Sequence, residues 1–107
     1  MPEKWADYAI IAVSYDSNST YIDCVEVRPD LGDKFGRSEH WSRSRVITSI
    51  KDGKSFVTAY ENTDNKWRRG ENVSIVSVRG TQYIRTDRNS SSSDNLGNLP
   101  RIQNGGC

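Results

Sequence analysis

The sequence predicts an α+β fold in which a single, mostly antiparallel sheet of about five strands packs against one short helix, in the order β-β-α-β-β-β. Two observations predict this class: runs rich in β-branched and aromatic residues flank one stretch with helical spacing, and the connections between the runs are short. With 107 residues and 34% hydrophobic side chains, the chain can build one modest core. We therefore expect one small domain over residues 1–100 and a flexible tail over residues 101–107.

Residues 7–15 and 21–27 predict a first antiparallel hairpin. The first run, DYAIIAVSY, is rich in strand-forming residues, and the polar string DSNST after it supplies turn residues. The second run, YIDCVEV, alternates as a strand does. Residues 28–37 contain one Pro and two Gly, which predicts a loop with Leu31 and Phe35 as candidate anchors.

A short helix is expected from Ser42 to about Asp52. Ser42 is a good N-cap, apolar residues then recur at helical spacing, and Gly53 suits the left-handed position after a helix end. Trp41 precedes the cap and is placed to pack on Val46 as a hydrophobic staple.

The run KSFVTAY follows the helix and is apolar at nearly every position, which is typical of a central strand covered on both sides. After the polar turn ENTDN, the next strand begins at KW. Residues 73–78 and 82–86 then predict a last hairpin that turns near Arg79 and Gly80.

The closing segment DNLGNLP follows a four-serine spacer, and it places Leu96 and Leu99 among turn-forming residues. A merely flexible tail has no need of two such apolar side chains. We expect Leu96 and Leu99 to bury against the sheet, so that this C-terminal segment docks on the domain.

Charge is unevenly distributed, although the net charge is only +1. Residues 1–33 carry seven acidic and two basic side chains, a balance of −5, whereas residues 66–88 carry six basic and two acidic ones, a balance of +4. One interpretation is that adjacent strands complement each other, at roughly 0.2 to 1 kcal/mol per facing pair. The other is a basic face for an anionic partner. The candidate interaction surface in this stretch comprises Lys66, Trp67, Arg68, Arg69, Arg79 and Arg85.

Residues suited to catalysis or metal binding are sparse. His40, the single histidine, precedes the predicted helix, where an imidazole more often makes a local hydrogen bond than performs catalysis. The carboxylates near the first hairpin lack the spacing of a calcium loop and indicate a solvated acidic edge, and Asp87 and Asp94 are expected to cap turns. We expect no catalytic residue, no cofactor and no metal site.

Cys24 and Cys107 have neither metal-ligand spacing nor the density of a disulfide framework, so we expect no disulfide within the chain. No apolar run approaches the roughly 20 residues that span a bilayer, and the N-terminus does not resemble a secretion signal. These features predict a cytoplasmic protein without a membrane partner.

Several stretches together resemble the small bacterial proteins of the domain of unknown function 3892 family: ADYAIIAVSYD, WSRSRVITSIKDGKSFVTAY, KWRRGENVSIVSV, and YIRTD with DNLGNLP. The resemblance covers about residues 6–100, and GKSFVTAY and the stretch from RTD through DNLGNLP are among its most specific parts. It implies a stand-alone bacterial protein. It implies no activity, cofactor or catalytic residue.

The sequence favours a non-enzymatic binding or interaction module. Its contact with a protein partner, or with a second copy of itself, would use Trp67, the nearby arginines and an exposed sheet edge. A weak nucleic-acid-binding module that uses the basic-aromatic patch from Lys66 to Arg69 is one alternative, although the net charge is small for that class. A small carboxylate-dependent enzyme is another, and a conjugated modifier, suggested by Gly105 and Gly106, is a third.

Overall fold

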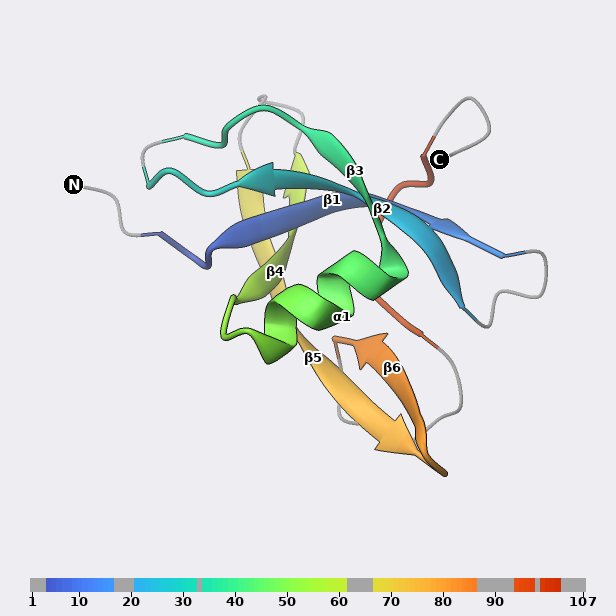
Figure 1. Cartoon of the computed structure of the whole chain (residues 1–107). Coiled ribbons are helices and arrows are strands. Elements are labelled where there is room, and N and C mark those ends of the chain that lie inside the picture. The colour runs from blue at the N-terminus through green and yellow to red at the C-terminus, as the bar shows by residue number, and fades with distance from the viewer. Residues whose placement is uncertain are drawn as a thin grey trace.

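A computed structural model describes residues 4–16, 21–32, 34–61, 67–86, 94–97 and 99–102 of the chain. Within these ranges, six strands form one sheet and one helix packs against it (Figure 1). The spatial order is β3-β2-β1-β4-β5-β6; β1 and β4 run parallel, and the other neighbours run antiparallel. The elements are β1 (Tyr8–Tyr15), β2 (Ile22–Pro29), β3 (Glu39–Ser42), α1 (Arg43–Lys51), β4 (Phe56–Glu61), β5 (Trp67–Val78) and β6 (Thr81–Arg85).

The predicted α+β class is confirmed, with one strand more than expected and one parallel pair. β3 is the strand that is not predicted from the sequence, because its four residues resemble the start of the helix. They pair with β2 instead, with Trp41 beside Val25 and His40 beside Glu26. Trp41 is buried and its neighbours are exposed, which is the alternation of a strand covered on one face. Four residues are too few for that period to be recognised.

The helix begins and ends as predicted. The Ser42 hydroxyl accepts a hydrogen bond from the Arg45 N–H at 3.2 Å, and Gly53 has a φ of 95° just after the helix end. Val46 and Ile47 are the buried residues of α1. With nine residues, α1 is far shorter than a bilayer-spanning helix, and no other helix within the described ranges meets that requirement.

The central position of β4 is also confirmed, because it lies between β1 and β5 and its first four residues are buried. Its parallel register with β1 is fixed by reciprocal hydrogen bonds between Asp7 and Ser55. The Asp7 carboxylate accepts from the Ser55 N–H at 2.9 Å, and the Ser55 hydroxyl accepts from the Asp7 N–H at 3.0 Å. The Tyr8 N–H donates to the Ser55 carbonyl at 3.1 Å and starts the ladder.

The last hairpin turns where the sequence predicts. Val78 pairs with Thr81, and the two residues between them, Arg79 and Gly80, have φ values of 53° and 83°. Positive φ at both positions gives the turn whose twist matches that of the flanking strands.

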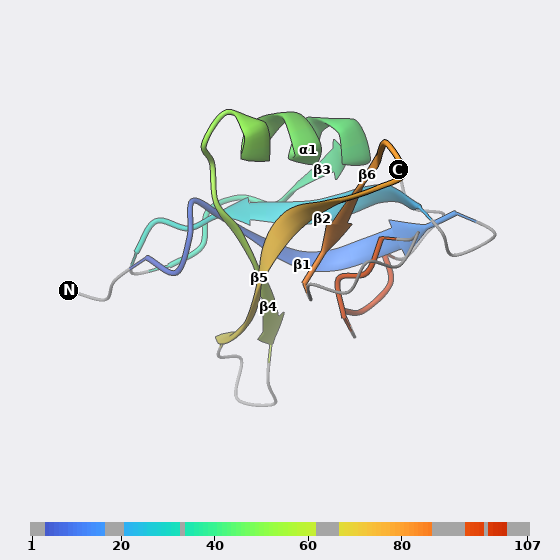
Figure 2. The same ribbon diagram turned by 90° about the horizontal axis from the view of Figure 1, so that it is seen from below.

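The sheet has two different faces (Figure 2). One face is covered by α1 and carries the main core, which includes Ile10, Val25, Phe56 and the helix residue Val46. No helix of the described residues covers the opposite face, and a second, smaller cluster of buried residues lies there. This second cluster is the starting point for the candidate site.

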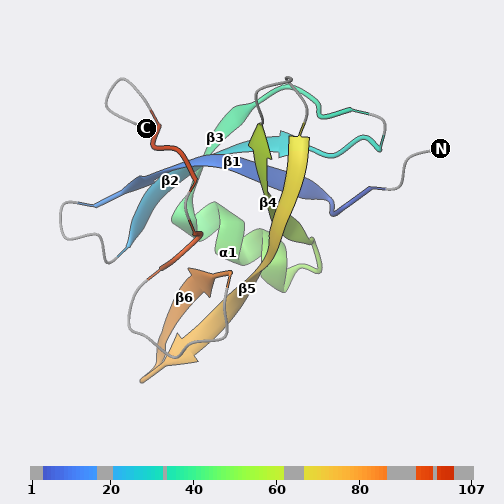
Figure 3. The same ribbon diagram turned by 180° about the vertical axis from the view of Figure 1, so that it is seen from behind.

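The C-terminal segment docks as predicted, since Leu96 and Leu99 are 0% and 2% exposed. Its backbone pairs in parallel with two strands: Asn95 bridges to Arg85 of β6, and Arg101 bridges to Val13 of β1 (Figure 3). The segment therefore connects β1, which belongs to the β3-β2-β1 half of the sheet, with β6, which belongs to the β4-β5-β6 half. It does so beyond the residues where β1 and β4 stop pairing. The pairing continues to Ile102, whose N–H donates to the Val13 carbonyl at 3.0 Å.

Candidate functional site

The face of the sheet opposite α1 has a floor of small apolar side chains. Ala9 of β1 lies beside Val57 of β4, and Ala59 follows Val57 on the same face. These three side chains are buried, and the partly buried Ile11 and Trp67 pack against them. We call this surface the helix-free face.

Three aromatic rings cover one end of the helix-free face. Trp5 meets Phe35 edge to face with centroids 5.8 Å apart, and Phe35 lies 5.2 Å from Trp67. The buried carboxylate of Asp30 fixes this end by accepting a hydrogen bond from the Trp5 N–H at 2.8 Å. Phe35 thus anchors the loop as predicted. The same prediction for Leu31 is wrong, because that side chain is 54% exposed.

The other end of the helix-free face is hollow because two neighbouring strands part there. The parallel pairing of β1 with β4 ends at Ile10, and a register shift between Ile10 and Ala12 marks a bulge in β1. Farther along, the Val13 N–H donates to the Pro100 carbonyl at 3.1 Å. The C-terminal segment, rather than β4, therefore lies beside this part of β1. A space remains between the C-terminal segment and the end of β4.

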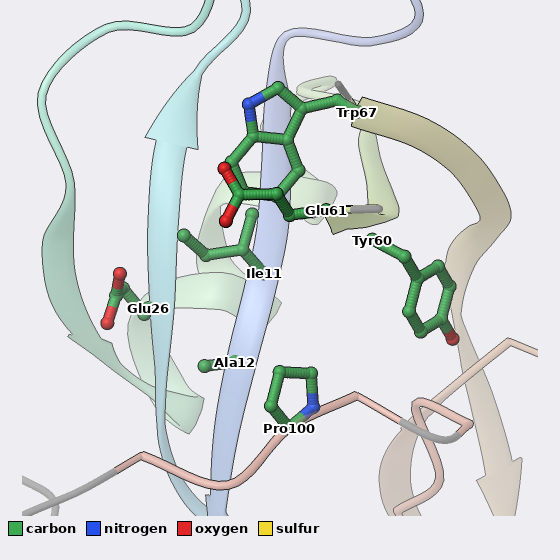
Figure 4. Close-up of a pocket in the computed structure, with 7 residues that line it drawn as sticks. All are labelled: Ile11, Ala12, Glu26, Tyr60, Glu61, Trp67 and Pro100. Atoms are coloured by element: carbon green, nitrogen blue, oxygen red, sulfur yellow. The ribbon is translucent and has the colours of Figure 1, made fainter. Parts of the chain in front are cut away.

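A pocket of about 360 Å³ occupies this hollow (Figure 4). In the close-up, Trp67 and Glu61 lie at one end of the pocket and Pro100 at the other, with Ile11 and Ala12 between them. The volume is at the lower end of the roughly 300–1,000 Å³ of small-molecule sites. We call it the Trp67 pocket; its lining residues are Ile11, Ala12, Glu26, Tyr60, Glu61, Trp67 and Pro100.

Among the described residues that line the pocket, the charged ones are two carboxylates, Glu26 and Glu61. Glu26 Oε1 lies 3.6 Å from His40 Nε2 across the β2–β3 pair, and the His40 side chain is 45% exposed. Glu61 is exposed and makes no hydrogen bond or ion pair within the described part of the chain. The pocket therefore presents negative charge to a ligand.

The sequence-predicted interaction surface is dispersed. Trp67 lines the pocket, and Arg69 lies on the same face, where its guanidinium donates to the Asn72 side chain at 2.9 Å. Arg68 pairs with Tyr60 and points to the opposite face, because successive residues of a strand alternate. Arg79 lies in the exposed turn between β5 and β6.

The two remaining members of the predicted surface are Arg85 and Lys66. Arg85 is 3% exposed, so it belongs to the interior of the domain rather than to an accessible basic patch. Its position in the last residue of β6 brings it against the C-terminal segment, where it bridges to Asn95. Lys66 lies outside the described residues.

Among the described residues of this face, His40 and Glu26 are the pair that most resembles a catalytic acid–base pair. Their 3.6 Å separation is longer than a hydrogen bond, and no hydroxyl or thiol hydrogen-bonds to His40 among the described residues. An activated nucleophile needs such a contact. Within the same residues, no three His, Cys, Asp or Glu side chains gather as a metal site would require.

Cys24 is buried on β2 and takes part in a disulfide bond, which corrects the expectation that the chain forms none. The sequence around Cys24 does not predict this bond, because a lone cysteine within a strand has no pairing pattern. Cys107, Gly105, Gly106 and Asp87 lie outside the described residues.

The pocket itself is not foreseen from the sequence, apart from Trp67. Ile11 and Ala12 look like ordinary strand residues, and the bulge that sets them side by side has no marker such as Gly. Glu26 and Glu61 are far apart in sequence and meet one pocket only through the strand order. The available signal is weak: small side chains, Ala9, Ala12 and Ala59, recur in strands that are otherwise bulky.

Comparison with known proteins gives one result. The family model described as protein of unknown function (DUF3892) matches residues 9–100, most of the chain. No curated protein and no solved structure matches it.

Proposed function

The chain belongs to the DUF3892 family, whose function is unknown, and we propose from its geometry that it is a non-enzymatic binding module whose ligand occupies the Trp67 pocket. One observation carries the proposal: on a face that no described helix covers, an apolar floor, an indole wall and two carboxylates meet in one concavity. Mostly apolar clefts with a few convergent polar groups are the usual form of ligand sites.

The alternatives have less support from the geometry. A partner that extends a sheet edge would meet strands of four and five residues, β3 and β6, and β6 already bridges to Asn95. A nucleic acid would need its phosphates to be held by arginines, but Arg68 and Arg69 point to opposite faces. A carboxylate-dependent enzyme that also used His40 would need these groups to converge in one cleft, but His40 does not line the pocket that holds Glu26 and Glu61.

The three tryptophans make the proposal testable by NMR, because each indole N–H gives its own signal. Trp67 lines the pocket, Trp41 is buried in the core beneath α1, and Trp5 lies in the aromatic row at the other end of the face. A library of small fragments should contain binders that shift the Trp67 indole signal and leave the Trp41 signal in place. Fragments that shift Trp41 or helix residues and never Trp67 would contradict the proposal.

A variant in which a larger side chain fills the pocket tests the same proposal. Ala12→Leu adds three carbons to the floor and should abolish the fragment-induced shift of Trp67, because it occupies the ligand's volume. Thr48→Leu adds a similar apolar side chain to the exposed surface of α1 and is the control for added hydrophobicity. Equal binding by Ala12→Leu, Thr48→Leu and the unaltered protein would overturn the assignment of the pocket.

A further inference from the structure

We infer that the Trp67 pocket binds a cationic side chain, the ammonium or guanidinium group of a lysine or arginine in a partner polypeptide, together with its aliphatic stem. The inference rests on the proposed function and adds the chemical class of the ligand. It draws on three features of the pocket: its charge, its aromatic wall and its open, apolar floor.

The charge of the lining favours a cation. Glu26 and Glu61 both line the pocket, and no described basic residue does. Glu61 has no hydrogen-bonding or ionic partner within the described residues, and Glu26 faces one half-exposed imidazole at 3.6 Å. A carboxylate or phosphate placed in the pocket would be repelled by both groups, whereas an ammonium would be attracted by both.

The aromatic wall favours a cation as well. The negative face of an indole attracts ammonium and guanidinium groups within about 6 Å of the ring. The protein itself uses Trp67 in this way, since the Arg28 guanidinium carbon lies 5.8 Å from the ring centroid. Arg28 is held there by the hydrogen bond from its Nε to the Gly36 carbonyl at 2.7 Å, and it is not a lining residue of the pocket.

The floor suits an aliphatic stem. Ile11, Ala12 and Pro100 lie between and beside the charged and aromatic groups, so a chain of methylenes that reaches Glu61 would cross apolar carbon. Lysine and arginine stems pack on apolar surface in this manner while the charged head meets polar groups. A volume of about 360 Å³ accommodates one such side chain rather than a large ligand.

The openness of the pocket points to a polypeptide as the source of the cation. Glu61 and Pro100 are exposed, so the mouth is not closed over its contents. A free small molecule is usually enclosed over most of its surface. A side chain that belongs to a partner gains further contacts with the rim through the residues on either side of it.

The test is a titration followed by the Trp67 indole signal. The probes are Nα-acetyl-lysine methylamide, Nα-acetyl-norleucine methylamide, which has the same four-carbon stem without the ammonium group, and Nα-acetyl-glutamate methylamide. The lysine probe should bind at least about fivefold more tightly than the norleucine probe, and the glutamate probe should not bind. Equal binding of the lysine and norleucine probes would overturn the inference and leave the proposed function intact. No shift with any probe or fragment would remove both.

Variants of the two carboxylates test whether their charge, rather than the shape of the pocket, attracts the lysine probe. Glu61→Gln should weaken the lysine probe about two- to fivefold, and Glu26→Gln/Glu61→Gln should weaken it about tenfold, while both keep the norleucine affinity. Glu71→Gln is the matched control, because Glu71 is an exposed carboxylate on β5 that does not line the pocket. An unchanged lysine affinity in the double variant would overturn the role of the carboxylates.

The source of the cation is tested with two further probes. A blocked Gly-Lys-Gly peptide should bind more tightly than n-pentylammonium, since the backbone on each side of the lysine contacts the rim. Equal affinity of the peptide and the free amine would overturn the assignment to a polypeptide partner.

Discussion

Asp94 and Arg43 form an ion pair that ties the C-terminal segment to the first residue of α1. Asp94 Oδ2 lies 2.6 Å from Arg43 Nε, and the Asp94 side chain is fully buried. The same carboxylate accepts backbone hydrogen bonds from Ile22 at 2.8 Å and from Ile84 at 2.9 Å. One side chain therefore joins β2, β6, α1 and the C-terminal segment, and Asp94 does much more than cap a turn.

Asp94→Ala is expected to destabilise the domain by about 3–5 kcal/mol, because it leaves the Arg43 charge and two backbone N–H groups without their acceptor. Urea unfolding measures the change in the free energy of unfolding. Asp23→Ala on the exposed side of β2 is the control and should change it by less than about 0.5 kcal/mol. A small effect of Asp94→Ala, equal to that of the control, would show that the buried pair contributes little.

Leu96→Ala and Leu99→Ala should each cost about 2–5 kcal/mol, since both side chains are buried in the main core. Truncation after Asp87 removes both leucines and Asp94, together with Cys107, the other cysteine of the chain, and should lower the melting temperature sharply. Thermal unfolding followed by circular dichroism measures both effects. Leu31→Ala, at an exposed leucine, is the matched control. A truncated chain that melts with the full-length chain would refute the structural role of this segment.

Much of the fold can be predicted from the sequence where local chemistry decides the structure. Ser42 and Gly53 mark the helix ends, the Arg79–Gly80 pair marks the last turn, and the two leucines of the C-terminal segment mark its docking. The parallel pairing of β1 with β4 is not predictable in this way, because it depends on which strands become neighbours. β3 is too short to show a period.

The candidate site is less predictable than the fold because it arises where strands part. Trp67 stands out in the sequence, but its pocket depends on the end of the β1–β4 pairing and on the placement of Pro100 beside β1. Arg85 illustrates the reverse case: it belongs to the basic stretch 66–88 in the sequence, but in the structure it is buried against the C-terminal segment. Neither outcome follows from residue type or local spacing.

Acid should weaken the junction between β1 and β4. The backbone hydrogen bond from Ser55 lowers the pKa of Asp7 below its ordinary value of 3.8, with smaller help from the Ser55 hydroxyl and from Lys4. A depressed folded-state pKa stabilises the fold above the unfolded value, and this stabilisation is lost as the pH falls through the lower folded value. The stability difference between the unaltered protein and Asp7→Asn should therefore be constant above about pH 5 and shrink below about pH 4.

Carboxyl NMR titration reports the Asp7 pKa directly, and Ser55→Ala should raise it toward 3.8 by removing the hydroxyl donor while the backbone donor remains. An Asp7 pKa at or above 3.8 in the unaltered protein would contradict this account of the junction.

Gly70→Ala should destabilise the β4–β5 pair, because a Cβ at this position would lie 2.2 Å from the Thr58 hydroxyl oxygen and 2.7 Å from Cε2 of Tyr60. Thr58 is fully buried at a register shift in the β4–β5 pairing, between Val57 and Ala59. Its hydroxyl accepts a hydrogen bond from the Glu71 N–H at 2.9 Å, which holds the hydroxyl close to Gly70. A cost of about 1–3 kcal/mol in urea unfolding is expected. In a Thr58→Ala background the Gly70→Ala cost should shrink, since the nearest obstacle is gone; full additivity of the two substitutions would show that they do not meet.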